Sequence, residues 1–215
     1  GAAPYERTDL TVRGDGTVLA VIGTQASGQG HETAFAQVVA GTLGIPVESV
    51  RVRFGDTDVA RGGSGSHADR SMRLGGTILV RACHALVEQG LRRVALMLDS
   101  EVVNFADGEF RGQESSRSVG LFELAADDPL TATAEISTRL HAHPNGVAAC
   151  EVEVDRGTGA VKVSRYVSVD DVGQAINPMI VEGQLHGGTV QGIGEALFEQ
   201  VIYCLLYTSD AADEW

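Results

Sequence analysis

The stretch Gly28-Gln29-Gly30-His31 lies between a short apolar segment, Thr17 to Ile22, and a segment with the apolar spacing of a helix, Glu32 to Leu43. Two glycines in one turn allow positive φ angles, and they bring bare backbone N–H groups to the start of the helix. Such a helix start can hold an anion or a polar heterocycle. The amide of Gln29 both donates and accepts hydrogen bonds, which suits a polar heterocycle better than a simple phosphate.

Outward from this turn, β-hairpins and helices follow one another without a regular strand–helix alternation. Asp-Gly pairs mark hairpin turns, Gly44 and Pro46 end the first helix, and Asn177-Pro178 begins the last one. This order predicts an α+β fold of mixed β-hairpins and helices. The predicted hairpins cover residues 10–22, 102–111 and 147–169, the further strands 50–54 and 131–140, and the helices 32–43, 71–97, 119–125 and a last one from 178.

The composition limits the classes of partner. The chain has 215 residues, of which 43% are hydrophobic, and a formal charge of −13. Its excess of acids argues against nucleic acid or an anionic membrane surface as a partner, and no apolar run is long enough to span a membrane. Cys83 and Cys150 show neither metal-site spacing nor a disulfide framework, so we expect a reducing, cytoplasmic setting.

The last residues differ in character from the rest of the chain. Cys204 to Asp213 agree with a reading-frame translation of a transposon adapter used in sequencing libraries, so residues 204–215 are interpreted as a non-native tail. A native polar tail after a helix is the alternative. We therefore expect one domain over residues 1–203, truncated at both ends, since Gly1-Ala2-Ala3-Pro4 at the other end lacks an initiator Met.

The glycine-rich turn matches neither common phosphate-binding fingerprint. No Gly-Lys-Ser/Thr follows it, as a P-loop requires, and Thr33 stands where the dinucleotide fingerprint has a third glycine. A purely structural turn is the alternative. A second loop, Ser64 to Ser71, leads small hydroxyl residues into a helix, where they could reach phosphate or pterin oxygens. A solvated loop is the alternative there, and Arg70 could pair with a phosphate or with an acid.

The last helix holds glycines at positions where each costs about 1 kcal/mol of helix stability relative to alanine. Close approach of a ligand or of another backbone would explain them, and Gln191 on that thin face could reach a heterocycle. His141 and His143 are interpreted as an exposed strand face and Glu195 as a surface residue, so we predict no metal ligand. The glycines are Gly183, Gly187, Gly188 and Gly192.

In order along residues 10–203, these blocks resemble the large, molybdenum-cofactor-binding subunit of the xanthine dehydrogenase, aldehyde oxidase and carbon monoxide dehydrogenase family. The resemblance implies that the chain is a molybdenum-cofactor-binding domain. The matching blocks are Gly28 to Gln37 with Gly55-Asp56-Thr57-Asp58, Ser66 to Ser71 with Gly75-Gly76, and Val152 to Asp155 followed by Asp170-Asp171-Val172-Gly173, Ile176-Asn177-Pro178 and Gly187 to Gly194.

The resemblance also implies the cofactor and its partners. The expected cofactor is Mo-molybdopterin in its cytosine dinucleotide form, with 2Fe–2S and FAD carried by an iron–sulfur subunit and an FAD subunit in a dimer of heterotrimers. The residues implied to bind the cofactor are Gly28, Gln29, Gly30, His31, Ser66, His67, Ala68, Asp69, Arg70, Ser71 and Gln191.

Family members oxidise a carbon with oxygen from water, so the resemblance implies a small-molecule substrate, either an aldehyde or an N-heterocycle. Glu195 follows Gln191 too closely to be the family's general base, which we expect downstream of this chain. The loop reads Gly65-Ser66-His67-Ala68-Asp69-Arg70-Ser71, whereas carbon monoxide dehydrogenases read closer to Gly-Thr-Tyr-Gly-Ser-Arg-Ser. Carbon monoxide oxidation, a non-catalytic cofactor-binding homologue and an acidic domain without a ligand remain as alternatives.

Overall fold

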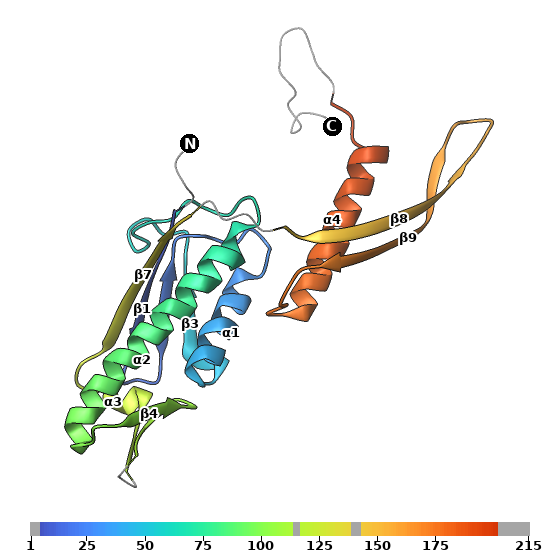
Figure 1. Cartoon of the computed structure of the whole chain (residues 1–215). Coiled ribbons are helices and arrows are strands. Elements are labelled where there is room, and N and C mark those ends of the chain that lie inside the picture. The colour runs from blue at the N-terminus through green and yellow to red at the C-terminus, as the bar shows by residue number, and fades with distance from the viewer. Residues whose placement is uncertain (1–4, 114–116, 139–142, 202–215) are drawn as a thin grey trace. The chain divides into compact units, whose positions relative to one another are not determined.

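A computed structural model describes residues 5–113, 117–138 and 143–201 (Figure 1). The chain forms two compact units, residues 1–142 and 143–215, and each is described by itself. The domain predicted over residues 1–203 spans the first unit and the second unit up to residue 203. The adapter-like tail and His141 lie outside the described residues.

The first unit is built on a four-stranded sheet in the order β3-β2-β1-β7. The hairpin predicted around Gly14-Asp15-Gly16 is confirmed, because Val12 pairs with Val18 and the Asp15 carboxylate accepts from the Thr17 N–H at 3.0 Å. β3 is parallel to β2, and the other pairs are antiparallel. The strands are β1 (Tyr5–Val12), β2 (Val18–Ile22), β3 (Val50–Arg53) and β7 (Leu130–Ser137).

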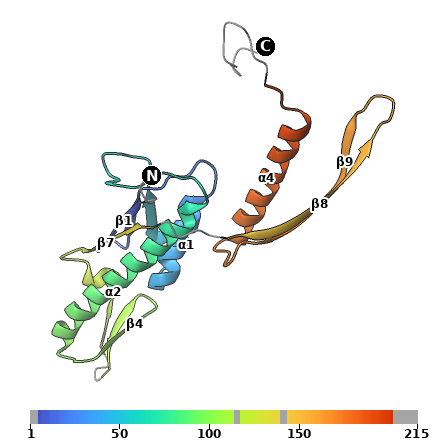
Figure 2. The same cartoon turned by 45° about the horizontal axis from the view of Figure 1, so that its top comes forward.

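Two long helices, α1 (His31–Leu43) and α2 (Thr77–Leu98), cover one face of this sheet (Figure 2). Burial alternates along β1, so that every second side chain points toward the helices. The predicted end of α1 is confirmed, since Gly44 takes the left-handed conformation (φ 64°). The core includes Leu10, Val12, Ile22, Phe35, Leu43, Ile78, Leu79, Leu86, Phe110 and Leu130.

Two predicted helices differ from expectation at their starts. The long helix begins with a π-helical turn, η2 (Ser71–Gly76), and the predicted helix over 119–125 begins as strand β6 (Ser118–Gly120), because Val119 pairs with Phe110 of β5. A π-helical turn is rare and is often found at functional sites. The remaining elements are η1 (Val47–Ser49), β4 (Val103–Ala106), β5 (Glu109–Gly112) and α3 (Leu121–Leu124).

The second unit consists of a long hairpin, β8 (Asn145–Val154) with β9 (Val161–Asp171), and helix α4 (Pro178–Leu197). The predicted start of α4 is confirmed, because the Asn177 side chain accepts from the Ile180 N–H at 3.1 Å. No described residue of this unit is buried. Within the described ranges of the chain, no helix combines the length and the apolar character needed to cross a bilayer.

Candidate functional site

Helix α1 begins in the predicted glycine turn without a side-chain cap. Gly28 has φ 97° and Gly30 has φ 69°, which are left-handed conformations that favour glycine. The Gly30 carbonyl accepts the first helical hydrogen bond, from the Ala34 N–H at 3.1 Å. The N–H groups of the first turn have no partner within an α-helix, so they remain as donors at the positive end of the helix dipole.

The second predicted loop contains two consecutive non-glycine residues in the left-handed region, Ala68 (φ 49°) and Asp69 (φ 54°). This conformation costs roughly 1–2 kcal/mol for an ordinary L-residue, and less for Asp. His67, Ala68 and Asp69 are exposed, whereas Ser66 is half-buried and Ser71 is buried. The exposed part of the loop is therefore strained, while its end at Ser71 is buried. Backbone strain of this kind is concentrated at functional sites.

The buried side chain of Arg70 anchors this loop to the rest of the unit. Its guanidinium lies 2.9 Å from the Glu6 carboxylate, and the two side chains are 1% and 0% exposed. It also donates to the carbonyls of Tyr5, at 2.7 Å, and Gly65. Burial raises the pKa of Glu6, and the charge of Arg70 opposes that rise. The sequence left either a phosphate or an acid as the partner of Arg70. The structure shows an acid, Glu6, so Arg70 holds the loop in place.

Gln29 and Ser66 join the two loops. The Gln29 Nε2 donates to Ser66 Oγ at 3.1 Å, and the Gln29 side chain accepts from the Ser27 N–H. Ser66 Oγ is also 2.8 Å from Ser71 Oγ, which lies 2.7 Å from Thr24 Oγ1. The structure thus brings together the predicted residues Gln29, Ser66 and Ser71. Sequence reasoning missed Thr24, because no spacing rule connects it with a serine 47 positions away.

The backbone at Gly23 is also in close contact with the backbone at Gly62 and Gly63. A Cβ on Gly23 would lie 1.9 Å from the Gly62 carbonyl oxygen, and one on Gly63 would lie 2.6 Å from Gly23 Cα. Only glycine permits this approach. The Gly62-Gly63 pair is the signal for this contact in the sequence.

His31 lies buried at the start of α1, 7% exposed, with its ring stacked on Phe35 at a centroid distance of 5.2 Å. Burial lowers the pKa of His31, and a hydrogen bond with the backbone of Gln25 partly opposes the shift. Among the described residues, its Nδ1 has no hydrogen-bond partner.

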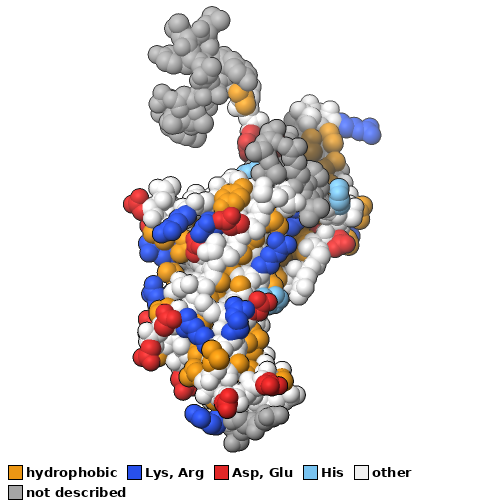
Figure 3. Space-filling view, turned by 60° about the vertical axis from the view of Figure 1, so that its left-hand side comes forward, with side chains coloured by type: hydrophobic (Ala, Val, Ile, Leu, Met, Phe, Trp, Pro, Cys, Tyr) orange, Lys and Arg blue, Asp and Glu red, His pale blue; other side chains and the backbone are white. Residues whose placement is uncertain are grey.

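These features fit a large polar ligand with acceptor oxygens. A Cβ on Gly28 or Gly65 would meet no described heavy atom within 4 Å, so both glycines leave open space beside the loops. Helix α1 starts without a side-chain cap, and the buried Nδ1 of His31 has no partner in the described chain. Figure 3 shows acidic and basic side chains scattered over one face, without a continuous basic area of the kind that binds nucleic acid.

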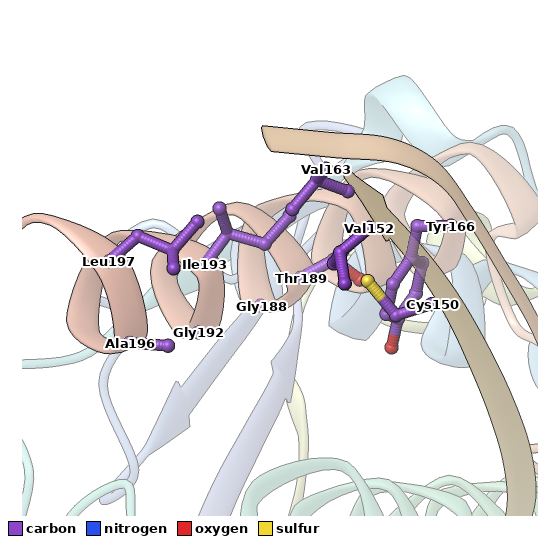
Figure 4. A pocket seen from close by; sticks show the side chains of 10 residues that line it. All are labelled: Cys150, Val152, Val163, Tyr166, Gly188, Thr189, Gly192, Ile193, Ala196 and Leu197. Atoms are coloured by element: carbon purple, nitrogen blue, oxygen red, sulfur yellow. The ribbon is translucent and has the colours of Figure 1, made fainter. Parts of the chain in front are cut away.

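Gln191 lies in the second unit, exposed on α4. It follows Gly183 and Gly187 at spacing four, which places the three on one helix face. Gly188 and Gly192 lie on another face, beside a groove of about 340 Å³ between α4 and the hairpin (Figure 4). A Cβ on any of these four glycines would meet no described atom within 4 Å, so packing inside the unit does not explain them.

The described cysteines are both free. Burial raises the pKa of Cys83 to about 12, which keeps it a thiol, and Cys150 is exposed. Within the described ranges, no three His, Cys, Asp or Glu side chains are grouped so that they could hold a metal ion.

Known proteins resemble this chain over nearly its whole length. It is 32% identical over 214 residues to the carbon monoxide dehydrogenase large chain of Hydrogenophaga pseudoflava, and 37% identical over 221 residues to the nicotine 6-hydroxylase large subunit of Paenarthrobacter nicotinovorans. Each alignment covers 94% of this chain and 27% of the relative, so the chain spans about a quarter of the relatives' length.

A crystal structure of Cu,Mo-CO dehydrogenase in its carbon monoxide reduced state matches with a TM-score of 0.86 at 28% identity, over 95% of this chain and 29% of that one. The α+β architecture predicted from the sequence is thereby confirmed as that of a known fold. The family described as the molybdopterin cofactor-binding domain matches residues 2–213. The resemblance noted in the sequence is therefore confirmed, and the chain belongs to the molybdopterin cofactor-binding domain family.

Proposed function

We propose that the chain is the cofactor-holding part of the catalytic large subunit of a molybdenum hydroxylase, which oxidises an aldehyde or an N-heterocycle with oxygen derived from water. The observation that carries this proposal is the joining of two glycine-rich loops by Gln29 and Ser66 beside the uncapped start of α1. When bound, the molybdenum cofactor would supply the two-electron oxidation.

The residues of the chain would bind and orient that cofactor. Backbone N–H groups at the start of α1 and the Ser66 hydroxyl would donate to its phosphate or pterin oxygens. Gly28 and Gly65 would let it approach the backbone closely. Gln191 would contribute an amide from the second unit. The short side chain of Ala68, exposed at the loop tip, would leave room for a substrate.

The finer features of the proposal follow the family resemblance. They are the cytosine dinucleotide form of the cofactor, electron transfer to an iron–sulfur subunit and an FAD subunit, a dimer of heterotrimers and a general-base glutamate outside this chain. The free cysteines Cys83 and Cys150 support a reducing, cytoplasmic location.

The test uses the full-length protein that carries this chain, purified from a host that makes molybdenum cofactors. We expect molybdenum bound in near-stoichiometric amount, a fluorescent pterin after denaturation and cytidine monophosphate after acid hydrolysis. The double variant Gln29→Ala with Gln191→Ala should lose most of the pterin. Gln89→Ala is the matched control, because Gln89 is a half-buried glutamine that hydrogen-bonds Thr131, on an element that contributes no residue to the site.

The alternatives give different results. Unchanged pterin in the double variant would contradict the cofactor site, and bound cofactor without oxidation of any aldehyde or N-heterocycle would indicate a non-catalytic homologue. Oxidation of carbon monoxide is the second candidate, favoured by the similarity to carbon monoxide dehydrogenases. It would be shown by carbon monoxide, and not the organic substrates, reducing an artificial electron acceptor.

A further inference from the structure

The hydroxyl groups behind Ser66 form a continuous line into the core. Thr24 is 0% exposed and lies 2.7 Å from Ser71, which is 5% exposed and lies 2.8 Å from Ser66. Gln29 contacts Ser66 from the other loop at 3.1 Å. Two side chains, Gln29 and Ser71, thus contact the half-buried Ser66, and Thr24 reaches it through Ser71.

The direction of each hydrogen bond follows from the donors available. The Ser27 N–H can only donate, so the Gln29 oxygen faces Ser27 and its NH₂ group faces Ser66. Ser66 Oγ therefore accepts from Gln29. This assignment fixes the orientation of the amide from chemistry, without a choice between its two ends.

Thr24 is constrained in the same way. Among the described residues, Ser71 is the partner of its hydroxyl, and a buried hydroxyl proton without an acceptor costs about 1–3 kcal/mol. Thr24 therefore donates to Ser71, and Ser71 donates its single proton to Ser66. Ser66 Oγ then accepts two hydrogen bonds, and its own proton remains available for donation to a ligand.

Building on the proposed function, we propose that Thr24 is a positioning residue of the cofactor site, which acts through Ser71 so that the Ser66 hydroxyl is a fixed donor to an acceptor oxygen of the cofactor. Hydrogen bonds in a row polarise one another, which strengthens the last donor. Without the Thr24 hydroxyl, the Ser71 oxygen loses its donor, so Ser71 is held less firmly and its O–H is less polarised, which weakens Ser66 as a donor to the cofactor.

The experiment measures cofactor retention in the full-length protein, loaded with cofactor and then diluted at a fixed elevated temperature. Protein is separated at intervals by gel filtration, and molybdenum and pterin remaining bound are measured. Thr24→Val, which keeps the shape but removes the hydroxyl, should release cofactor about three- to tenfold faster, the equivalent of one net hydrogen bond. Thr24→Ser restores the donor and should behave as the wild type.

Thr8→Val is the matched control. Thr8 is also 0% exposed, and its hydroxyl donates to the Val21 carbonyl at 2.9 Å, outside the line that ends at Ser66. It should lose comparable stability without faster cofactor release. Thr24→Val added to Ser66→Ala should have no further effect, because the two residues act as one unit.

The outcomes separate this inference from the proposed function. Equal release from Thr24→Val and Thr8→Val, or additive effects of Thr24→Val and Ser66→Ala, would overturn the role of Thr24 while leaving the cofactor site intact. A wild-type protein without molybdenum or pterin would instead overturn the proposed function. Circular dichroism checks that each variant is folded. If Thr24→Val does not fold, Ser71→Ala replaces it, because Ser71 is the next residue in the row of hydrogen bonds from Thr24 to Ser66.

Discussion

Gly90 and Gly41 both lie inside long helices, but their surroundings differ. A Cβ on Gly90 of α2 would lie 2.1 Å from the Phe110 ring, whereas one on Gly41 of α1 would meet no described atom within 4 Å. We predict that Gly90→Ala lowers the free energy of unfolding by about 1–3 kcal/mol through overpacking. Gly41→Ala should raise it by about 1 kcal/mol, since alanine favours helix. Urea unfolding of the purified chain measures both, and changes of the same sign would contradict this packing.

His31 should make stability depend on pH. Its pKa is lowered by burial from the ordinary value of 6.5, so between the two values the unfolded chain binds a proton that the folded chain does not. Stability should therefore fall as the pH drops below about 6.5 and stop falling below the folded pKa. The slope of unfolding free energy between pH 7.5 and 5.0 should be smaller in His31→Gln, and an identical slope in both proteins would contradict a buried neutral His31.

At the residue scale, the sequence predicted residues that gather at the site, but not the distant partners that hold them. Gln29, Ser66 and Ser71 were predicted together and lie together. That Arg70 binds the cofactor stays a prediction, and its contacts with Glu6 and two carbonyls had no local signal in the sequence. Partners that lie far apart in sequence depend on the tertiary fold, which leaves no local pattern.

At the scale of elements, the buried ion pair connects β1 with the second loop. Arg70→Met would leave the Glu6 carboxylate buried and unpaired, so we predict a loss of about 3–5 kcal/mol in the free energy of unfolding. Arg93→Met is the control, because the Arg93–Asp128 pair is 30% and 74% exposed, and it should cost less than about 1 kcal/mol. Urea unfolding compares the two.

A second substitution tests the cause of that loss. Adding Glu6→Gln to Arg70→Met removes the uncompensated charge and should restore part of the stability. A double variant less stable than Arg70→Met would show that packing of the long side chains, and not the unpaired charge, dominates at this position.

Element boundaries were predictable where a residue with a strict backbone preference stands at them. Gly44, Asp107-Gly108 and Asn177-Pro178 mark a helix end, a hairpin turn and a helix start as expected. Two features were not predictable. The short strand β6 exists because Val119 pairs with β5, and the π-helical turn brings Gly75 to where a Cβ would lie 3.0 Å from Ile22 and Phe35. Both are tertiary effects that override local propensity.

At the scale of the whole molecule, the two units differ in what they bury. The described hydrophobic core lies entirely between Leu10 and Leu130 in the first unit, and no described residue after position 142 is buried. We predict that residues 1–142 unfold cooperatively when produced alone, while residues 143–215 alone do not, because burial supplies the main driving force for folding. Thermal unfolding followed by circular dichroism tests both fragments, and a cooperative transition in residues 143–215 would contradict the prediction.

The contact between Gly23 and Gly63 restricts which amino acids the chain tolerates at these two positions. Each backbone occupies the space that a side chain on the other would need, so a change at one position cannot be compensated at the other by any of the remaining amino acids. In a saturation library selected for folded protein, both codons should return glycine alone. The open positions Gly28 and Gly65 should tolerate asparagine or aspartate, the residues most often found at positive φ after glycine.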